Sequence, residues 1–231
     1  MEIAKNTSEK YQKIIEAATK VFAKKGFYNS KVADIAAEAD VADGTIYLYF
    51  KNKDDILISI FEHSMDVFIS TVKKTLETSL DPAEKLELFI KLHLELVEKN
   101  PYVAQVLQIE LRQSSKFMKE YDVRKFKAYL EIISEIIQQG QSKGVFNNNL
   151  DLHVLSRAIF GAVDEMALEW ILLKKKKYTL ESCAKQLANV FINGLKKCSE
   201  EENKKHDVIA SGVIPAKAGI HDNERGNLER R

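Results

Sequence analysis

The chain has 231 residues, of which 45% are hydrophobic and 30% charged, and its formal net charge is +1. No apolar run approaches the ~20 residues that cross a bilayer, and the charged N-terminus lacks the core of a signal peptide. We therefore predict a cytoplasmic protein without a membrane partner. Three prolines and nine glycines favour long helices over a β-rich fold, in one large or two modest domains.

The charge distribution gives mixed support to a nucleic-acid partner. The first 57 residues contain nine lysines and nine acids, whereas nucleic-acid-binding domains are usually basic. However, residues 17–33 contain four lysines and no acid, and Lys51 and Lys53 follow further along. Two such clusters are able to flank a groove and contact phosphates. The alternative is that they are ordinary solvated lysines on helix surfaces.

Apolar residues at helical spacing predict a first helix that stops at Gly26 and a second that begins near Ser30, which is suited to the N-cap. Residues 32–57 then indicate two short helices around a tight turn, running into a third helix. Ile35 is expected in the hydrophobic centre and Asp40 in the turn, because aspartate tolerates a left-handed backbone. This is the sequence form of a helix-turn-helix, which presents a short helix to the DNA major groove.

The rest of the chain as far as Cys198 is also predicted to be helical. The sequence Asp81-Pro82-Ala83-Glu84 combines an N-cap acid, a proline at the first helical position and a glutamate at the third. Further helices are expected from about Lys53 to before Asp81, from Asp81 onward, over Asn100–Leu111, over Phe117–Gln139 with a stop at Gly140 and Gly144, over Leu152–Leu173, and from Thr179 to Lys197. Asp151 and Thr179 are expected to cap the last two of these helices.

The composition changes after Cys198. Residues 199–231 contain acids, lysines and three of the nine glycines without an amphipathic period, so we predict a disordered tail. Residues 212–221 resemble a translated bacterial repeat element fused to the end of the gene. The tail would then be an appendage, with a partner-binding segment as the alternative.

The string Gly44-Thr45-Ile46-Tyr47-Leu48-Tyr49-Phe50-Lys51-Asn52-Lys53 resembles the end of the DNA-binding domain in the tetracycline-repressor (TetR) family. The similarity covers about residues 8–57, and Asp40 departs from the glycine that is usual in the family. The resemblance implies an all-α, TetR-like fold. It has a three-helix DNA-binding domain over residues 1–52 and a six-helix ligand-binding and dimerisation bundle over residues 53–198, connected by the long helix. It also implies a homodimer on double-stranded operator DNA.

Seven residues are expected at the DNA, by this resemblance and by their chemistry. Thr45 and Tyr47 match positions that face the groove, and Tyr49 matches a tyrosine that contacts the DNA backbone. Lys53 would meet a phosphate at the positive N-terminus of the long helix. For one of the two tyrosines, half-buried packing is the alternative. The predicted DNA-binding residues are Ser30, Lys31, Gly44, Thr45, Tyr47, Tyr49 and Lys53.

Two segments of the bundle are candidates for the dimer interface. Around Gly161 and Gly194, small residues lie beside large apolar ones, which lets helices approach closely. The alternative is an intramolecular helix pair. The predicted interface residues are Phe160, Gly161, Leu187, Val190, Phe191 and Gly194.

Residues 109–114, 159–165 and 53–61 also resemble the fatty-acid-degradation repressors within the TetR family. Those relatives sense long-chain acyl-CoA, which releases them from the operators of β-oxidation genes. The resemblance therefore implies a ligand-responsive transcriptional repressor of fatty-acid metabolism. Its effector would be long-chain acyl-CoA, and it would use no cofactor or metal.

An acyl chain requires a long apolar tunnel, and the phosphates of CoA favour arginine. Three of the six arginines fall in the bundle, and Arg112 is our first choice because it lies in a resembling segment. An ion pair of Arg112 with Glu110 or Asp164 is the alternative. Polar residues within apolar stripes are further candidates, among them His93 and Gln108. The predicted ligand-binding residues are Leu107, Arg112, Gln113, Tyr129, Phe160, Asp164 and Trp170.

Two other functions compete with this interpretation. A multidrug-sensing repressor of an efflux gene would use aromatic and acidic groups for a cation, for which Trp170, Glu165 and Glu169 are available. An enzyme such as an acyl-CoA thioesterase is disfavoured because the sequence lacks a Gly-x-Ser-x-Gly motif, a metal-ligand cluster and a phosphate loop. We therefore predict no catalytic residues.

Overall fold

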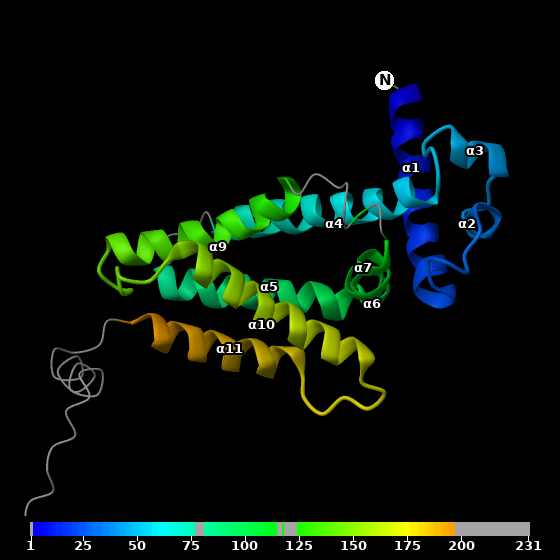
Figure 1. The fold of residues 1–231 in the computed structure, drawn as a ribbon. Coiled ribbons are helices and arrows are strands. Elements are labelled where there is room, and N and C mark those ends of the chain that lie inside the picture. The colour runs from blue at the N-terminus through cyan, green and yellow to red at the C-terminus, as the bar shows by residue number, and fades with distance from the viewer. Residues whose placement is uncertain (1, 77–80, 115–116, 118–123, 197–231) are drawn as a thin grey trace, which may run out of the picture. The chain divides into compact units, whose positions relative to one another are not determined.

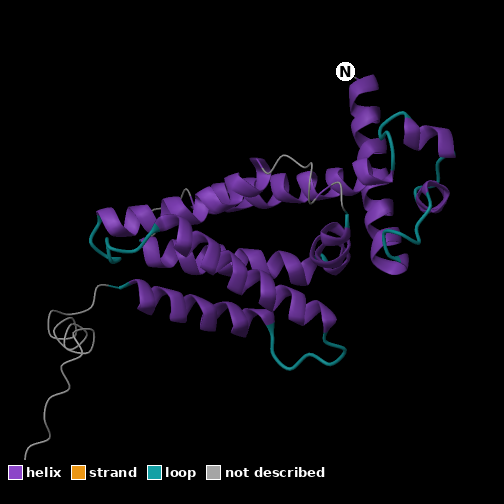
Figure 2. Ribbon diagram, viewed as in Figure 1, coloured by secondary structure: helices purple, strands orange, loops and turns teal. Residues whose placement is uncertain are grey.

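The computed structural model describes residues 2–76, 81–114, 117 and 124–196, while the side chains of residues 2–8 and of Gln113 lie outside the description. The described residues form helices joined by loops (Figure 1, Figure 2), which confirms the predicted all-α fold. One isolated antiparallel bridge joins Phe146 to Lys196. The tail predicted to be disordered lies outside the described residues.

The first three helices are α1 (Glu2–Lys25), α2 (Val32–Glu38) and α3 (Asp43–Tyr47). Helix α1 is followed by Gly26, whose φ of 80° is the left-handed conformation that glycine adopts without strain after a helix. Asp40, in the turn between α2 and α3, has a φ of 51°, which confirms the left-handed backbone predicted there. In Figure 1, α2 and α3 lie on the same side of α1.

These helices share a hydrophobic core with the start of α4 (Lys53–Leu76). Ile35 of α2 and Ile46 of α3 are buried in it, the former as predicted. The same core includes Val106 and Leu111, which lie much further along the sequence. The N-terminal helices therefore pack directly on a segment that lies well beyond the predicted domain boundary. The domain boundary at residue 52 stays a prediction.

Helix α4 continues into a bundle with α5 (Pro82–Lys99), α9 (Arg124–Ser142), α10 (Leu152–Leu172) and α11 (Leu180–Leu195). Helix α5 packs against α11 and α9, and α9 packs against α10 and α4 (Figure 1). Aromatic rings fill the centre, where the centroid of Phe68 lies 5.6 Å from that of Phe89 and 5.2 Å from that of Tyr129. No helix in the described part of the chain is long and apolar enough to span a membrane.

Side-chain caps begin α5, α10 and α11, as predicted. The Asp81 carboxylate accepts a hydrogen bond of 2.9 Å from the Glu84 N–H, and the Glu84 carboxylate accepts one of 2.9 Å from the Asp81 N–H. This reciprocal pair is a capping box. Asp151 and Thr179 accept bonds of 2.9 and 3.1 Å from backbone N–H groups in the first turns of α10 and α11.

The helix predicted over Asn100–Leu111 is not a single α-helix. Helix α6 (Pro101–Gln105) passes into a π-helical turn, η1 (Val106–Glu110), and then into α7 (Leu111–Gln113). A π turn changes the direction in which the following side chains point, and such turns occur often at functional positions. The apolar spacing of the sequence gives no sign of this turn.

Of the two glycines predicted to stop α9, Gly144 is confirmed, because the helix ends at Ser142 and Gly144 has a φ of 70°. The stop predicted at Gly140 is wrong, because the helix continues through it. A Cβ atom on Gly140 would lie only 2.0–2.7 Å from ring carbons of Phe146. Residue 140 is therefore a glycine because an aromatic ring packs on it. The predicted start at Phe117 precedes residues 118–123, which lie outside the described residues.

Candidate functional site

The first candidate site is the exposed side of α3 with the residues beside it. The Tyr47 side chain is 58% exposed, Lys31 and Gly44 are exposed, and Thr45 is half-buried. Within the described part of the chain, no atom lies within 4 Å of a Cβ built on Gly44. These four predicted DNA-binding residues therefore lie where another molecule can reach them.

Tyr49 is half-buried in an aromatic group. Its ring centroid lies 6.4 Å from that of Tyr11, and Tyr11 in turn stacks on Phe50 at 5.2 Å. Phe50 belongs to the buried core. Of the two tyrosines, Tyr49 is thus the one that packs within the domain and Tyr47 the one that is open to a partner.

The prediction for the Ser30 side chain is wrong. Ser30 is only 3% exposed, and its hydroxyl donates a hydrogen bond of 2.7 Å to the carbonyl oxygen of Gly26. The residue at the N-cap of α2 is Lys31, whose N–H is bonded at 2.8 Å to the Asp34 carboxylate. The Ser30 hydroxyl therefore stabilises the turn between α1 and α2 and does not face the surface.

The Lys53 side chain also differs from its prediction. Its ammonium donates hydrogen bonds to the carbonyl oxygens of Phe27, Tyr28 and Ser30 at 2.6, 3.2 and 3.0 Å. The same ammonium lies 4.5 Å from the centroid of the Phe27 ring. An ammonium has three N–H donors, and all three are used here. Lys53 therefore ties α4 to the turn after α1 and has no donor left for a phosphate.

Most lysines of the predicted basic cluster have acidic or aromatic neighbours. Lys25 pairs with Asp34 at 2.7 Å and Lys20 with Glu38 at 3.6 Å. The hydrogen bond from Lys25 is the main cause that holds the pKa of Asp34 below its usual value. Lys24 lies 5.8 Å from the Tyr102 ring centroid. Lys31 and Lys51 remain as exposed cations beside α3.

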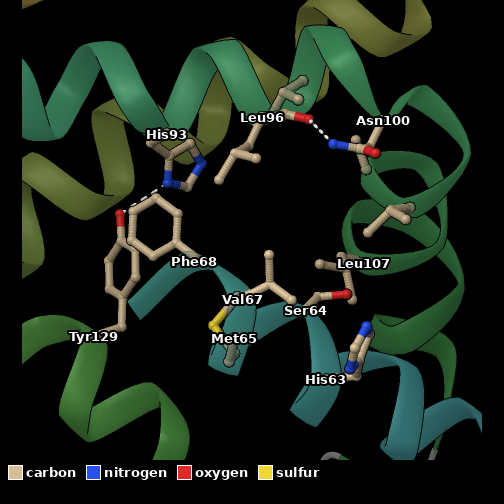
Figure 3. A pocket seen from close by; sticks show the side chains of 13 residues that line it. His63, Ser64, Met65, Val67, Phe68, His93, Leu96, Asn100, Leu107 and Tyr129 are labelled. Atoms are coloured by element: carbon tan, nitrogen blue, oxygen red, sulfur yellow. Dashed lines mark hydrogen bonds between the residues drawn. The ribbon is translucent and has the colours of Figure 1, made fainter. Parts of the chain in front are cut away.

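The second candidate site is a cavity of about 580 Å³ in the bundle. This volume falls within the range of roughly 300–1,000 Å³ that is usual for small-molecule sites. A smaller cavity of about 200 Å³ adjoins it between α4 and α5 (Figure 3). The residues that line both cavities form what we call the junction, and they are Met65, His93, Val97, Ala104, Leu107 and Tyr129.

Charged and polar side chains gather on one side of the larger cavity. The buried Gln108 amide contacts both Asp164 and Arg112, and the bond from Arg112 Nη2 to Gln108 Oε1 measures 3.0 Å. Arg112 also pairs with Asp164, which is one of the two ion pairs considered for it. The Arg157 guanidinium lies 5.2 Å from the Phe126 ring centroid. Both arginines are exposed to solvent and line the cavity.

A polar pair lies among the apolar walls of the junction. The Tyr129 hydroxyl oxygen is 3.0 Å from His93 Nδ1 (Figure 3). Burial lowers the pKa of His93 to about 4, so its ring is neutral at neutral pH. Burial also raises the pKa of Tyr129 well above its usual value, so the phenol keeps its proton.

Five of the seven predicted ligand-binding residues line the larger cavity, namely Leu107, Arg112, Tyr129, Phe160 and Asp164. The side chain of Gln113 lies outside the described residues.

Trp170 is a wrong prediction, because it packs against the bundle core with the Lys176 ammonium 3.9 Å from its ring centroid and lines neither cavity. The sequence-based set also missed Phe61, Met65, Phe126 and Arg157. Arg157 is one of the three bundle arginines that the sequence offers as candidates. Nothing in the apolar stripes distinguishes Phe61, Met65 and Phe126 from ordinary core residues.

The two sites are connected through η1. Glu110 is buried, and its carboxylate accepts a hydrogen bond of 2.7 Å from the backbone N–H of Phe27. Just before η1, the Gln105 amide donates a bond of 2.7 Å to the carbonyl oxygen of Ala23. Since Leu107 and Gln108 of η1 line the cavity, one segment contacts both the cavity and the end of α1.

The predicted dimer residues divide between the surface and the interior. Val190 is 66% exposed, and Gly161 and Gly194 have no neighbour within 4 Å of a built Cβ in the described residues. Leu187 and Phe191 are half-buried. Phe160, by contrast, turns inward, with its ring centroid 4.8 Å from that of Phe126. Phe160 therefore lines the larger cavity, and its role at an interface stays a prediction.

Comparison with protein families finds a match for the N-terminal helices and another for the bundle. The family described as bacterial regulatory proteins, tetR family, matches residues 14–60, and the family described as YsiA-like protein, C-terminal region, matches residues 61–194. Together with the helix-turn-helix and the cavity-containing bundle, these matches define a transcriptional regulator. The chain belongs to the TetR family.

Individual proteins and solved structures are also similar to this chain. The fatty acid metabolism regulator protein of Bacillus subtilis (strain 168) is 37% identical over 191 residues, which are 83% of this chain and 98% of that protein. The crystal structure of FadR from Bacillus subtilis in complex with stearoyl-CoA matches with a TM-score of 0.75 at 37% identity, over 80% of this chain and 99% of that one. The fatty acid degradation regulator FadR from Bacillus halodurans matches with a TM-score of 0.76 at 36% identity, over 82% and 97%.

Proposed function

We propose that this protein is a transcriptional repressor of fatty-acid metabolism genes. It binds operator DNA in the cytoplasm as a homodimer and is released when long-chain acyl-CoA enters the bundle cavity. The observation that carries the proposal is the 37% identity along 98% of a fatty acid metabolism regulator. That match includes the ligand-binding half of the chain as well as the DNA-binding half.

The chemistry of the cavity supports an acyl-CoA effector. The apolar walls suit an acyl chain, because burying it removes apolar surface from water. Arg112 and Arg157 lie at the solvent-exposed side, and guanidinium groups match the geometry of phosphate oxygens. In the free protein, Asp164 pairs with Arg112. A CoA phosphate that binds Arg112 competes with this carboxylate, so binding rearranges the polar group at η1.

The segment around η1 supports a route from the cavity to the DNA. Leu107 and Gln108 contact the cavity, while Gln105 and Glu110 hold the backbone at the end of α1. A ligand that shifts η1 therefore shifts α1, and α2 and α3 move with it because the four segments share one core. Coupling of ~1–3 kcal/mol between two sites is ordinary for such a switch.

A dimer is part of the proposal because one short recognition helix reads only a half-site. The exposed faces of α10 and α11 are the surface we assign to it, with Gly161, Val190 and Gly194 near its centre and Leu187 and Phe191 beside them. On the DNA, the groove-facing residues are Gly44, Thr45 and Tyr47, with Lys31 and Tyr49 toward the phosphate backbone.

The competing functions have less support. For a cation-sensing repressor, Glu165, Glu169 and Trp170 would have to line the cavity. Glu165 is exposed, Glu169 accepts a hydrogen bond of 2.7 Å from the Tyr178 hydroxyl, and neither lines a cavity. An enzymatic role is not part of the proposal, because the similar proteins named above are regulators.

The test is release from DNA by the effector. A duplex that the protein selects from a random library is labelled, and its anisotropy is followed while palmitoyl-CoA, free CoA or butyryl-CoA is added. We expect palmitoyl-CoA to release the protein, and the other two to do so at much higher concentration or not at all. Arg112→Ala should raise the palmitoyl-CoA concentration required.

The control is a cationic dye of similar size to a drug, added to the same complex. Release by the dye and not by palmitoyl-CoA would overturn the proposed effector. Equal affinity for the selected duplex and for random DNA at physiological salt would overturn the regulatory function itself.

A further inference from the structure

The junction of the two cavities contains one polar pair in an otherwise apolar wall. Its other members are the side chains of methionine, valine, alanine and leucine. His93 comes from α5 and Tyr129 from α9, so the pair bridges two helices of the bundle. Buried polar groups cost free energy unless they are hydrogen-bonded. The hydrogen bond within this pair therefore determines which donor or acceptor remains available to a ligand in the cavity.

The direction of the hydrogen bond follows from the surroundings of Tyr129. This residue is 1% exposed, and rings surround it, including those of Phe68 at 5.2 Å, Phe89 at 5.3 Å and Phe160 at 5.6 Å between centroids. Such rings offer no strong acceptor to a hydroxyl. His93 Nδ1, 3.0 Å away, is the acceptor in reach, so the Tyr129 hydroxyl donates to it.

This bond fixes the tautomer of His93. A neutral imidazole carries one N–H, and with Nδ1 acting as the acceptor the proton must reside on Nε2. Figure 3 shows Nδ1 turned to the Tyr129 hydroxyl and the second ring nitrogen on the opposite side, among the side chains that line the cavity. In the described part of the chain, His93 forms no hydrogen bond other than the one to Tyr129. The Nε2–H group is therefore an oriented donor that faces the cavity.

We propose that His93 recognises the thioester of the effector by donating a hydrogen bond from its Nε2–H group to the thioester carbonyl oxygen. This inference rests on the proposed function, in which the effector is an acyl-CoA. An acyl chain has no acceptor of its own, and the thioester carbonyl is the acceptor that enters an apolar cavity directly behind it. Tyr129 is a positioning residue, because it holds the ring of His93 in the tautomer that donates.

The position of the junction agrees with this order of groups. Arg112 and Arg157 line the larger cavity on its solvent-exposed side, whereas the junction lies where that cavity meets the smaller one. If the CoA phosphates bind the arginines and the thioester carbonyl binds His93, the pantetheine arm of CoA lies between these two positions. The apolar walls are then left for the acyl chain. A free fatty acid would bring a carboxylate instead, and a neutral donor without a cation beside it favours a carbonyl over a charged group.

The test compares two ligands that differ in one carbonyl. Palmitoyl-CoA carries the thioester, and S-hexadecyl-CoA, a thioether, has a methylene group in place of the carbonyl. Direct binding is measured by calorimetry for the wild type, His93→Phe, His93→Gln and Tyr129→Phe, each checked by circular dichroism for folding. We expect the wild type to prefer the thioester by roughly ten- to a hundredfold, because the thioether leaves the buried donor unpaired.

The preference should fall to near unity in His93→Phe, which has no donor, and should survive in part in His93→Gln, which keeps one. Tyr129→Phe should lower it, because the imidazole can then place its proton on either nitrogen. His153→Phe, the same substitution at an exposed position that lines neither cavity, is the matched control and should keep the wild-type preference.

Equal affinity of the wild-type protein for both ligands would overturn the inference while leaving the acyl-CoA effector intact, and this comparison needs no variant. An unchanged preference in His93→Phe would also overturn it, since the carbonyl would then be held elsewhere. If neither ligand binds the wild type, the proposed function fails, and this inference fails with it.

Discussion

The buried carboxylate of Glu110 accepts a hydrogen bond of 2.7 Å from the backbone N–H of Phe27, a residue that lies 83 positions earlier in the chain. Glu110 ends the π-helical turn η1, and Phe27 lies in the loop that leads from α1 to α2. Two residues before Glu110, Gln108 lines the bundle cavity. The helix-turn-helix is thus tied to the same segment that forms a wall of the cavity.

The first prediction concerns this link. Glu110→Ala leaves the buried N–H of Phe27 without a partner, which should cost about 1–3 kcal/mol of the free energy of unfolding. Because the link also carries the proposed signal, palmitoyl-CoA should release the variant from DNA less effectively than it releases the wild type. Urea unfolding and the anisotropy titration measure the two effects. Glu110→Gln keeps an acceptor and should lie closer to the wild type, and a wild-type response in Glu110→Ala would show that η1 does not transmit the signal.

The second prediction separates two lysines near the DNA-binding surface. Lys53→Met removes three hydrogen bonds to carbonyl oxygens and should lower the free energy of unfolding by about 2–3 kcal/mol. Because the Lys53 ammonium has no free donor, the salt dependence of DNA binding should stay unchanged. Lys31→Met should leave the free energy of unfolding unchanged. It should reduce the slope of the logarithm of DNA affinity against the logarithm of salt concentration by about one phosphate contact. A normal melting temperature with a reduced slope in Lys53→Met would contradict this assignment.

The third prediction concerns the dimer surface. Val190→Glu places a charge on an exposed apolar position of α11 and should shift the protein from dimer to monomer in sedimentation experiments. Operator affinity should fall with it, because each half-site is then read alone. Lys185→Glu, an acid at another exposed position of the same helix, should remain dimeric. If Val190→Glu is also dimeric, the interface lies elsewhere.

The fourth prediction is a pH dependence that originates at His93. Its pKa is about 4 in the folded protein because of burial, compared with an ordinary value of about 6.5 in the unfolded chain. Between these values the unfolded state binds the additional proton, so stability falls as the pH is lowered. The wild type should lose about 2 kcal/mol more than His93→Phe between pH 7 and pH 5 in urea unfolding. The same loss in both proteins would mean that His93 is not kept neutral by burial.

Much of the fold follows from local patterns in the sequence. The capping box at Asp81 and Glu84, the caps at Asp151 and Thr179, and the left-handed turn at Asp40 all depend on residues a few positions apart. These caps and this turn depend on local backbone geometry, which is why the sequence predicts them correctly. The burial of Ile35 follows in the same way from helical spacing.

Long-range contacts account for the errors. Lys53 looks like a phosphate-binding lysine at a helix start, and only the tertiary structure brings three carbonyl oxygens to its ammonium. Gly140 looks like a helix stop until Phe146 is seen to pack on it. Trp170 and Phe160 lie on the same helix, and the sequence does not reveal which of them faces the cavity. The π turn η1 is in contact with α1, which is another long-range relationship that the sequence does not reveal.

Release of DNA by the effector requires an energetic coupling between the cavity and the DNA-binding surface, and such a coupling must be reciprocal. The most direct test is the dissociation constant of palmitoyl-CoA, measured with the free protein and with the protein saturated by the selected duplex. A reciprocal coupling predicts that DNA weakens palmitoyl-CoA binding by the same factor by which palmitoyl-CoA weakens DNA binding. Equal dissociation constants in the two measurements would contradict it.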